Sequence, residues 1–158
     1  MAKLDFARRD DYGLFLIVHY AALQTLEPDW RAADRDDFSL MMQCLRDDVL
    51  ALGVLPTRLF LLAPGILDVG VQLGISYIIR GSRLSAQFLR SRVAPEFTAS
   101  YLKCLTRTNW DQFLSDVARL LEDRTSNIST DDIVQGAQIA MQRIATLFEH
   151  ATLRDRRD

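Results

Sequence analysis

Hydrophobic residues recur along much of the chain at spacings of three and four, the pattern of helices that bury one face. The first such segment covers residues 10–26, and Pro28 is expected to stop it. Its inward face is expected to consist of Leu14, Phe15, Val18, Ala21, Ala22 and Leu26.

A second helix is predicted over residues 38–52. Asp36 or Asp37 is its expected N-cap, and Gly53 is the expected C-terminal stop. Residues 55–64 are expected to form a loop because prolines bracket that stretch.

The longest apolar-periodic stretch covers residues 65–93, and Pro95 ends it. This stretch predicts either one bent helix or two helices, with Gly74 and Gly81 as the points where a helix would weaken. A short helix is expected over residues 97–105.

Two further helices are predicted in the last third of the chain. Asn109 is expected to cap a helix over residues 110–124, and Thr130 with its two following aspartates is expected to cap a helix that ends near Leu153. We find no run of alternating apolar and polar residues bounded by turn residues, so no strand is predicted.

Length and composition agree with an all-α fold of six to eight helices in one domain. The chain has 158 residues, of which 49% are hydrophobic and 25% charged, with only seven Gly and four Pro. Residues 1–153 are expected to form this single domain, and residues 154–158 a charged C-terminal tail.

Charge and apolar runs exclude several classes of partner. A net charge of −2 gives no reason to expect binding to nucleic acid or to an anionic membrane. The most apolar region cannot cross a bilayer as one helix, since it is interrupted by Pro56, Arg58, Pro64 and Asp68. We see no signal peptide, and Cys44 and Cys104 fit no metal or disulfide pattern, so we expect reduced thiols in a cytoplasmic protein.

Residues 73–86 carry the most specific pattern in the chain, Leu-Gly-x-x-Tyr-x-x-Arg-Gly-Ser-x-Leu-Ser-Ala. This pattern resembles the distal-helix segment of bacterial, biliverdin-producing heme oxygenases, which runs roughly L-G-x-x-Y-x-x-E-G-S-x-L-G-G. Four other segments, at residues 12–27, 45–53, 110–114 and 137–148, resemble segments of that family in the same order. The resemblance therefore covers nearly the whole chain and implies a heme-oxygenase-like multi-helix bundle.

The remnant of the family's distal heme site would consist of Gly81, Ser82, Ser85 and Ala86. Two family glycines, which let the helix approach heme closely, are replaced by Ser85 and Ala86. The family's axial histidine lies on a first helix, yet no histidine precedes Tyr12, so we expect that proximal-ligand helix to be missing. These departures imply a degenerate site with no bound cofactor or metal; heme would be the cofactor only of an active enzyme.

Three candidate residues have alternative interpretations. His19 is a possible heme ligand, but a lone histidine is more often a surface or half-buried residue, here packed by Tyr20 and Leu23. Arg80 stands where the family has Glu; a solvated arginine is the favoured interpretation, and an altered pocket or a salt bridge to a partner is the alternative. Ser82 could serve the distal side or could simply bond back to the preceding helical turn.

The missing helix and the replaced glycines favour a non-catalytic binding or regulatory module as the leading functional hypothesis. The resemblance implies a signalling context, because relatives of this kind often accompany phytochrome photoreceptors. A homodimer or a partner helix would cover the groove left by the missing helix. The expected interface residues are Leu14, Ile17, Val18, Tyr77, Arg80, Leu84 and Phe88. The alternatives are an active heme oxygenase, which converts heme to biliverdin, iron and CO with His19 as an atypical ligand, and a bundle that binds another small molecule.

Overall fold

The computed structural model describes residues 4–54, 67–106 and 109–154, and those residues form helices and no strands. The all-α prediction is therefore confirmed for this part of the chain. The elements are α1 Arg9–Leu26, η1 Glu27–Asp29, η2 Ala32–Asp34, α2 Arg35–Ala51, α3 Val69–Gly81, α4 Arg83–Arg90, α5 Ser100–Leu105, α6 Trp110–Glu122 and α7 Thr130–Arg154. None of the described helices is long and apolar enough to cross a membrane. The loop expected at residues 55–64 lies outside the described residues.

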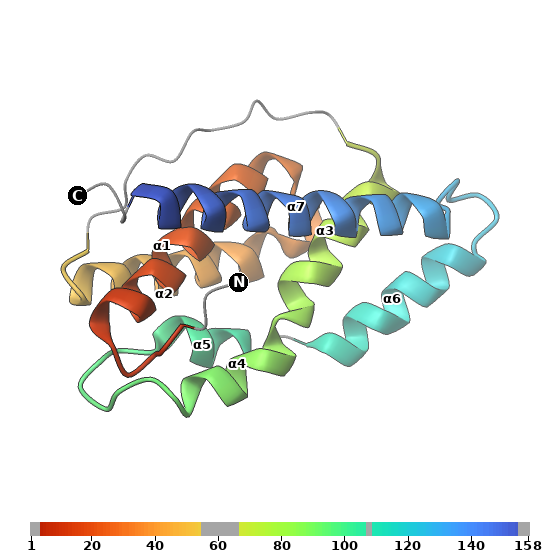
Figure 1. The fold of residues 1–158 in the computed structure, drawn as a ribbon. Coiled ribbons are helices and arrows are strands. Elements are labelled where there is room, and N and C mark those ends of the chain that lie inside the picture. The colour runs from red at the N-terminus through yellow and green to blue at the C-terminus, as the bar shows by residue number, and fades with distance from the viewer. Residues whose placement is uncertain (1–3, 55–66, 107–108, 155–158) are drawn as a thin grey trace.

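The long helix α7 runs along one side of the molecule and packs most extensively on α3 (Figure 1). Helix α1 packs on both α2 and α7, and the short α5 joins α2 to α4. Helix α6 projects from the body and makes its main contact with α3. The described helices thus form a packed bundle with one helix, α6, at its margin.

The core lies between α1, α2, α3 and α5. Its fully buried large side chains include Tyr12, Leu16, Phe38, Met41, Leu45, Ile75 and Leu102. Five of the six residues expected on the inward face of α1 are buried, and Leu14 is half-buried. The hydrophobic pattern therefore predicted the orientation of α1 correctly.

Glycines allow α3 and α7 to cross at backbone contact. A Cβ added to Gly74 would lie 1.9 Å from the carbonyl oxygen of Ile133, and one added to Gly136 would lie 1.9 Å from that of Val71. No side chain fits at such a distance, so both positions require glycine. The prediction that Gly74 weakens its helix is wrong, because α3 continues through Gly74. The prediction for Gly81 is confirmed, because α3 ends at Gly81 and α4 begins two residues later.

The capping predictions have mixed outcomes. The side chain of Asn109 accepts the N–H of Gln112 at 3.1 Å, which confirms the cap of α6. Helix α2 begins at Arg35, earlier than predicted, so Asp36 and Asp37 lie in its first turn and neither is the N-cap. Gly53 has a φ of 65° and ends α2 as predicted.

At the start of α7, the capping role belongs to Ser129 and not to Thr130. The hydroxyl of Ser129 accepts the N–H of Asp132 at 3.1 Å, and the Asp132 carboxylate accepts the N–H of Ser129 at 3.0 Å. This reciprocal pair is a capping box that uses Asp where Glu or Gln is more common.

Helix α5 is shorter than predicted because an acidic side chain fixes its first residue. The carboxylate of Asp48, on α2, accepts the N–H of Ser100 at 3.0 Å and that of Tyr101 at 2.9 Å. These N–H groups have no partner within the helix, so the buried carboxylate satisfies them and marks the N-terminus. Asp48 thereby also ties α5 to α2.

Candidate functional site

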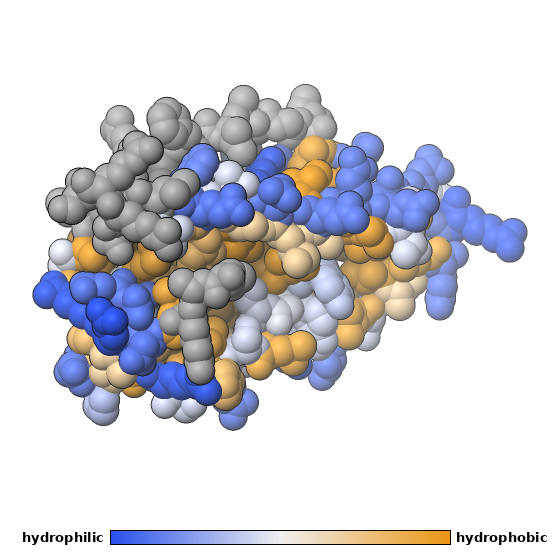
Figure 2. All heavy atoms as spheres, in the orientation of Figure 1, coloured by the Kyte–Doolittle hydropathy of each residue, from blue (hydrophilic) through white to orange (hydrophobic). Residues whose placement is uncertain are grey.

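A stripe of side chains at helical spacing follows α3 into α4 and reaches the surface. We call Tyr77, Gly81, Leu84 and Phe88 the α4 stripe; they lie four, three and four residues apart. Tyr77 is 42% exposed, Leu84 71% and Phe88 57%. In Figure 2, hydrophobic side chains reach the surface in the region of α4 and α6. The stripe contains Gly81, the first of the expected remnant distal positions.

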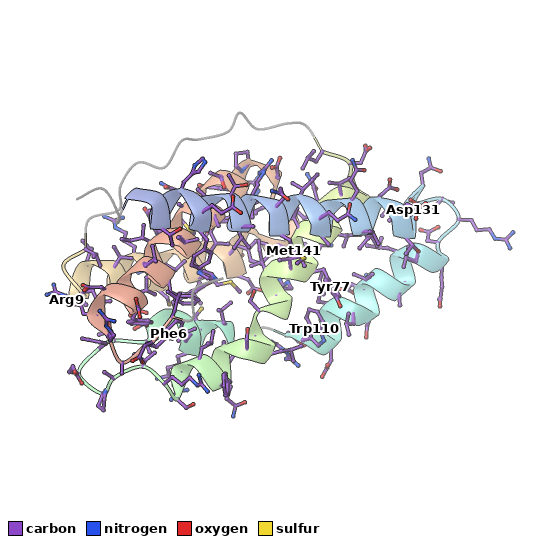
Figure 3. The ribbon with its side chains drawn as sticks, in the orientation of Figure 1. Phe6, Arg9, Tyr77, Trp110, Asp131 and Met141 are labelled. Carbon is purple, nitrogen blue, oxygen red and sulfur yellow. The ribbon has the colours of Figure 1, made fainter. Side chains whose placement is uncertain are left out.

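Trp110, the first residue of α6, covers the Tyr77 end of the α4 stripe. The rings of Tyr77 and Trp110 are 5.2 Å apart, and Figure 3 shows both where α3 approaches α6. The space beside Gly81 is bounded by the Trp110 ring, 3.6 Å from where a Cβ would lie. The guanidinium of Arg83 lies 5.8 Å from the centre of the same ring. No sequence pattern indicated that Trp110 borders Gly81, because the two residues lie on different helices.

The other remnant distal positions do not share one face. Ser85 is exposed beside the stripe, and its hydroxyl donates to the carbonyl of Ser82 at 3.0 Å. The Ser82 hydroxyl donates to the carbonyl of Ile78 at 3.0 Å, which is the back-bonding alternative. Ala86 is 1% exposed and packs in the core, so it does not place a side chain on the face with Gly81 and Ser85.

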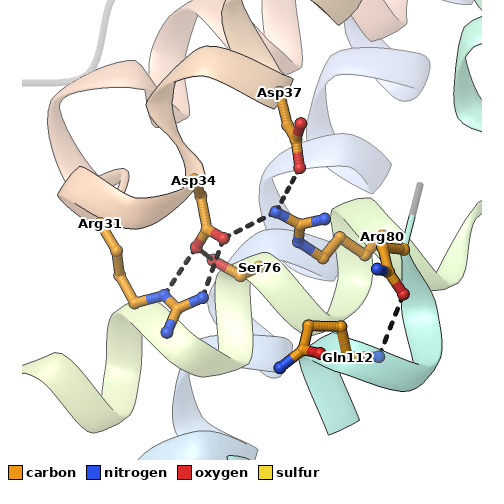
Figure 4. Close-up of polar contacts among 7 residues, drawn as sticks. Arg31, Asp34, Asp37, Ser76, Arg80 and Gln112 are labelled. Carbon is orange, nitrogen blue, oxygen red and sulfur yellow. Dashed lines mark hydrogen bonds and ion pairs between the residues drawn. The ribbon is translucent and has the colours of Figure 1, made fainter. Parts of the chain in front are cut away.

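Arg80 is buried, which contradicts the favoured interpretation of a solvated arginine. Its guanidinium donates to Asp34 at 2.9 Å and to Asp37 at 2.7 Å (Figure 4). The same group lies 5.4 Å from the centre of the Phe38 ring and 5.6 Å from that of Phe113. Arg80 therefore joins α3 to the start of α2 and is not available to a partner.

Asp34 is the centre of this ionic cluster. Besides Arg80, its carboxylate accepts from Arg31 in a two-pronged pair at 2.6 and 2.8 Å and from the Ser76 hydroxyl at 2.5 Å (Figure 4). Burial alone would raise the pKa of Asp34, but these donors outweigh it and hold the pKa below its usual range. The cluster spans three elements and was not anticipated, since no sequence pattern links these residues.

His19 lies in an aromatic enclosure between α1, α5 and α7. Its ring centre is 4.0 Å from that of Phe15, 5.8 Å from Tyr101 and 6.0 Å from Phe148. Its Nδ1 is 2.8 Å from the carbonyl oxygen of Phe15. Desolvation lowers the pKa of His19 to about 4, against a smaller opposing effect of this hydrogen bond. The imidazole is therefore neutral at pH 7.

This arrangement does not fit a heme held between His19 and the distal positions. The ring neighbours of His19 are Phe15, Tyr101 and Phe148, whereas Gly81 faces Trp110, and the two environments share no residue. An axial ligand and a distal helix must face the same porphyrin from opposite sides. Among the described residues, no three His, Cys, Asp or Glu side chains are placed together to hold a metal ion.

The expected interface residues divide between two environments. Tyr77, Leu84 and Phe88 are exposed on the α4 stripe, as an interface requires. On α1, Val18 is fully buried in a cluster with Leu147, and Leu14 packs at the edge of that cluster. Helix α7 covers this face of α1, so Val18 cannot belong to an exposed groove. Ile17 is half-buried.

Comparison with known proteins gave no relatives: no family model, no curated protein and no solved structure matches this chain.

Proposed function

We propose that this chain is a heme-oxygenase-like helical protein that does not degrade heme and works as a protein-binding module. The five sequence segments in family order support the first part. The exposure of the α4 stripe carries the second, because Leu84 and Phe88 are apolar side chains presented to solvent on a short helix. The enclosure of His19 by three aromatic rings supports the loss of heme chemistry.

The stripe has the features of a docking surface and not those of a core face. Its last two positions, Leu84 and Phe88, lie one turn apart, so both can enter one groove of a partner. Arg92 lies with its guanidinium 4.1 Å from the centre of the Phe88 ring. Aromatic and arginine side chains together are typical of the residues that dominate binding energy at interfaces.

The partner we propose is a second copy of this chain. Helix α4 carries basic residues and no acidic ones, and Arg90 and Arg92 are exposed at its end. Helix α6 carries three acidic residues, Asp111, Asp116 and Glu122, against one basic residue, Arg119, and its Leu114 and Leu121 are 40% and 39% exposed. In a two-fold dimer, α4 of each copy can pack on α6 of the other, which pairs apolar with apolar and basic with acidic surfaces.

Light scattering coupled to size-exclusion chromatography tests this dimer. We expect wild-type protein to show twice the mass of one chain and the variant Leu84→Glu to show a single chain at the same concentration. The matched control is Leu50→Glu, since Leu50 is a leucine 58% exposed on the outer face of α2. A monomeric wild type, or equal masses for both variants, would exclude a dimer through the α4 stripe.

An active heme oxygenase remains the second candidate because of one feature of His19. A hydrogen bond from one ring nitrogen to a backbone carbonyl is the usual arrangement of metal-ligating histidines, and it leaves the other nitrogen as the acceptor. Activity would require the rings around His19 to move apart. Comparing the hemin spectrum of wild type with that of His19→Ala tests this candidate directly.

A further inference from the structure

The two cysteines of the chain, sixty residues apart, line the same cavity between α2 and α5. Cys44 lies on α2 and Cys104 on α5, and both are half-buried thiols. The cavity has a volume of about 310 Å³. Its remaining lining consists of Asp37, Leu40, Met41, Ser100 and Lys103. The structure thus places two thiols from distant parts of the chain at one cavity.

The register of the two helices explains why the thiols meet. Asp48 on α2 accepts the N–H groups of Ser100 and Tyr101 at the start of α5, which fixes one point of contact. Cys44 precedes Asp48 by four residues on α2, and Cys104 follows Ser100 by four residues on α5. Each cysteine therefore lies one helical turn from the fixed contact. Both cysteines line the same cavity, so the two turns lead to the same part of the structure.

Helix packing brings facing positions within disulfide range. Packed helices have axes about 8–10 Å apart, and each Cα lies about 2.3 Å from its axis, so facing Cα atoms approach to about 3.4–5.4 Å. A disulfide requires Cα atoms that are less than about 7 Å apart. Helix α5 has only six residues, so a small adjustment of its position is possible without moving a long element.

We propose that Cys44 and Cys104 are a modification site that closes to an intramolecular disulfide when it reacts with a hydroperoxide. The thiolate of one cysteine attacks the peroxide oxygen, which breaks the O–O bond and gives a sulfenic acid and water, or an alcohol from an organic peroxide. The second thiol then attacks the sulfenic sulfur and displaces a second water. Two thiols lose two protons and two electrons, and one peroxide is reduced.

The disulfide would hold α5 on α2 by a covalent bond as well as by the Asp48 contact. This site is independent of the α4 stripe and of the proposed dimer. Closing a loop of about 60 residues restricts the unfolded chain, and the melting temperature should rise by about 10 °C. A dithiol reductant should reverse both the bond and the shift.

The experiment uses the full chain, reduced and then treated with one equivalent of hydrogen peroxide under dilute conditions. We expect the intact mass to fall by two hydrogens with no dimer on a non-reducing gel. Trypsin should release residues 36–46 and 104–107 as one linked peptide, which a reductant separates. The controls Cys44→Ser and Cys104→Ser should show neither the mass loss nor the rise in melting temperature.

Three results would each overturn the proposal. They are disulfide-linked dimers in place of an intramolecular bond, independent oxidation of each cysteine to sulfinic acid, and no reaction of either thiol. The first two would show that the two sulfur atoms do not reach each other in the folded chain, and the third that neither thiol reacts with the peroxide. Because the controls retain one thiol and the same fold, loss of structure cannot be mistaken for loss of the disulfide.

Discussion

Replacing Asp34 with Ala should destabilise the protein far more than the loss of any surface charge. The Asp34 side chain is 2% exposed and accepts four hydrogen bonds from Arg31, Ser76 and Arg80. Its removal leaves Arg80, 6% exposed, paired with Asp37, which is 52% exposed. A buried guanidinium would therefore lose its buried counter-charge.

We estimate the loss at about 3–5 kcal/mol, the usual cost of removing one partner of a buried ion pair. With a urea dependence of about 2 kcal/mol per molar, the unfolding midpoint should fall by about 2 M. The measurement belongs at pH 7. Because the folded pKa of Asp34 is lowered, its stabilising effect is fully present above the carboxyl range of the unfolded chain. That effect is lost as the pH falls through the folded pKa.

Urea unfolding followed by far-UV circular dichroism measures the difference. The matched control is Asp116→Ala, which removes an exposed ion pair between Arg119, 77% exposed, and Asp116, 37% exposed. That pair should contribute less than about 0.5 kcal/mol. If Asp34→Ala unfolds at the same urea concentration as Asp116→Ala, the ionic cluster does not hold α2 and α3 together as described.

Two further predictions concern the helix crossing and His19. Gly74→Ala should lower the free energy of unfolding by at least about 3 kcal/mol, since its Cβ would lie 1.9 Å from a backbone oxygen. Gly81→Ala should raise it by up to about 1 kcal/mol, because its Cβ meets Trp110 at an ordinary 3.6 Å. Equal melting temperatures for the two variants would contradict this prediction. Because the folded pKa of His19 is about 4 and the unfolded value about 6.5, the unfolded chain binds the proton first, so stability should fall as the pH drops from 6.5 to 4. His19→Phe should remove this part of the pH dependence of urea unfolding, and an unchanged dependence would refute the assignment.

The hydrophobic pattern predicted the helices because their burial repeats with the helical period. Helix α1 shows this most clearly, since its apolar residues at spacings of three and four are the ones that α2 and α7 bury. The cap at Asn109 was predictable because it involves only a residue three positions away. Interactions between residues close in sequence can be predicted from a single segment of the chain.

What could not be predicted depends on residues distant in sequence. Arg80 is buried because Asp34 and Asp37, more than forty residues earlier, supply its charge partners. Gly74 marks a crossing with α7, and nothing within its own helix distinguishes that role from a weak point. Ala86 belongs to the core because the chain breaks at Ser82 and α4 packs on α5. The α4 stripe was anticipated in Tyr77, Leu84 and Phe88, but the burial of Val18 depends on α7.

The most direct test of the central claim is a hemin titration of the purified protein, followed at the Soret band, with ascorbate added at the end. A heme-oxygenase-like protein without heme chemistry should leave the spectrum that of free hemin and form no biliverdin. A saturable one-to-one Soret shift, followed by loss of heme and growth of biliverdin absorbance, would contradict the account and make His19 the first residue to replace.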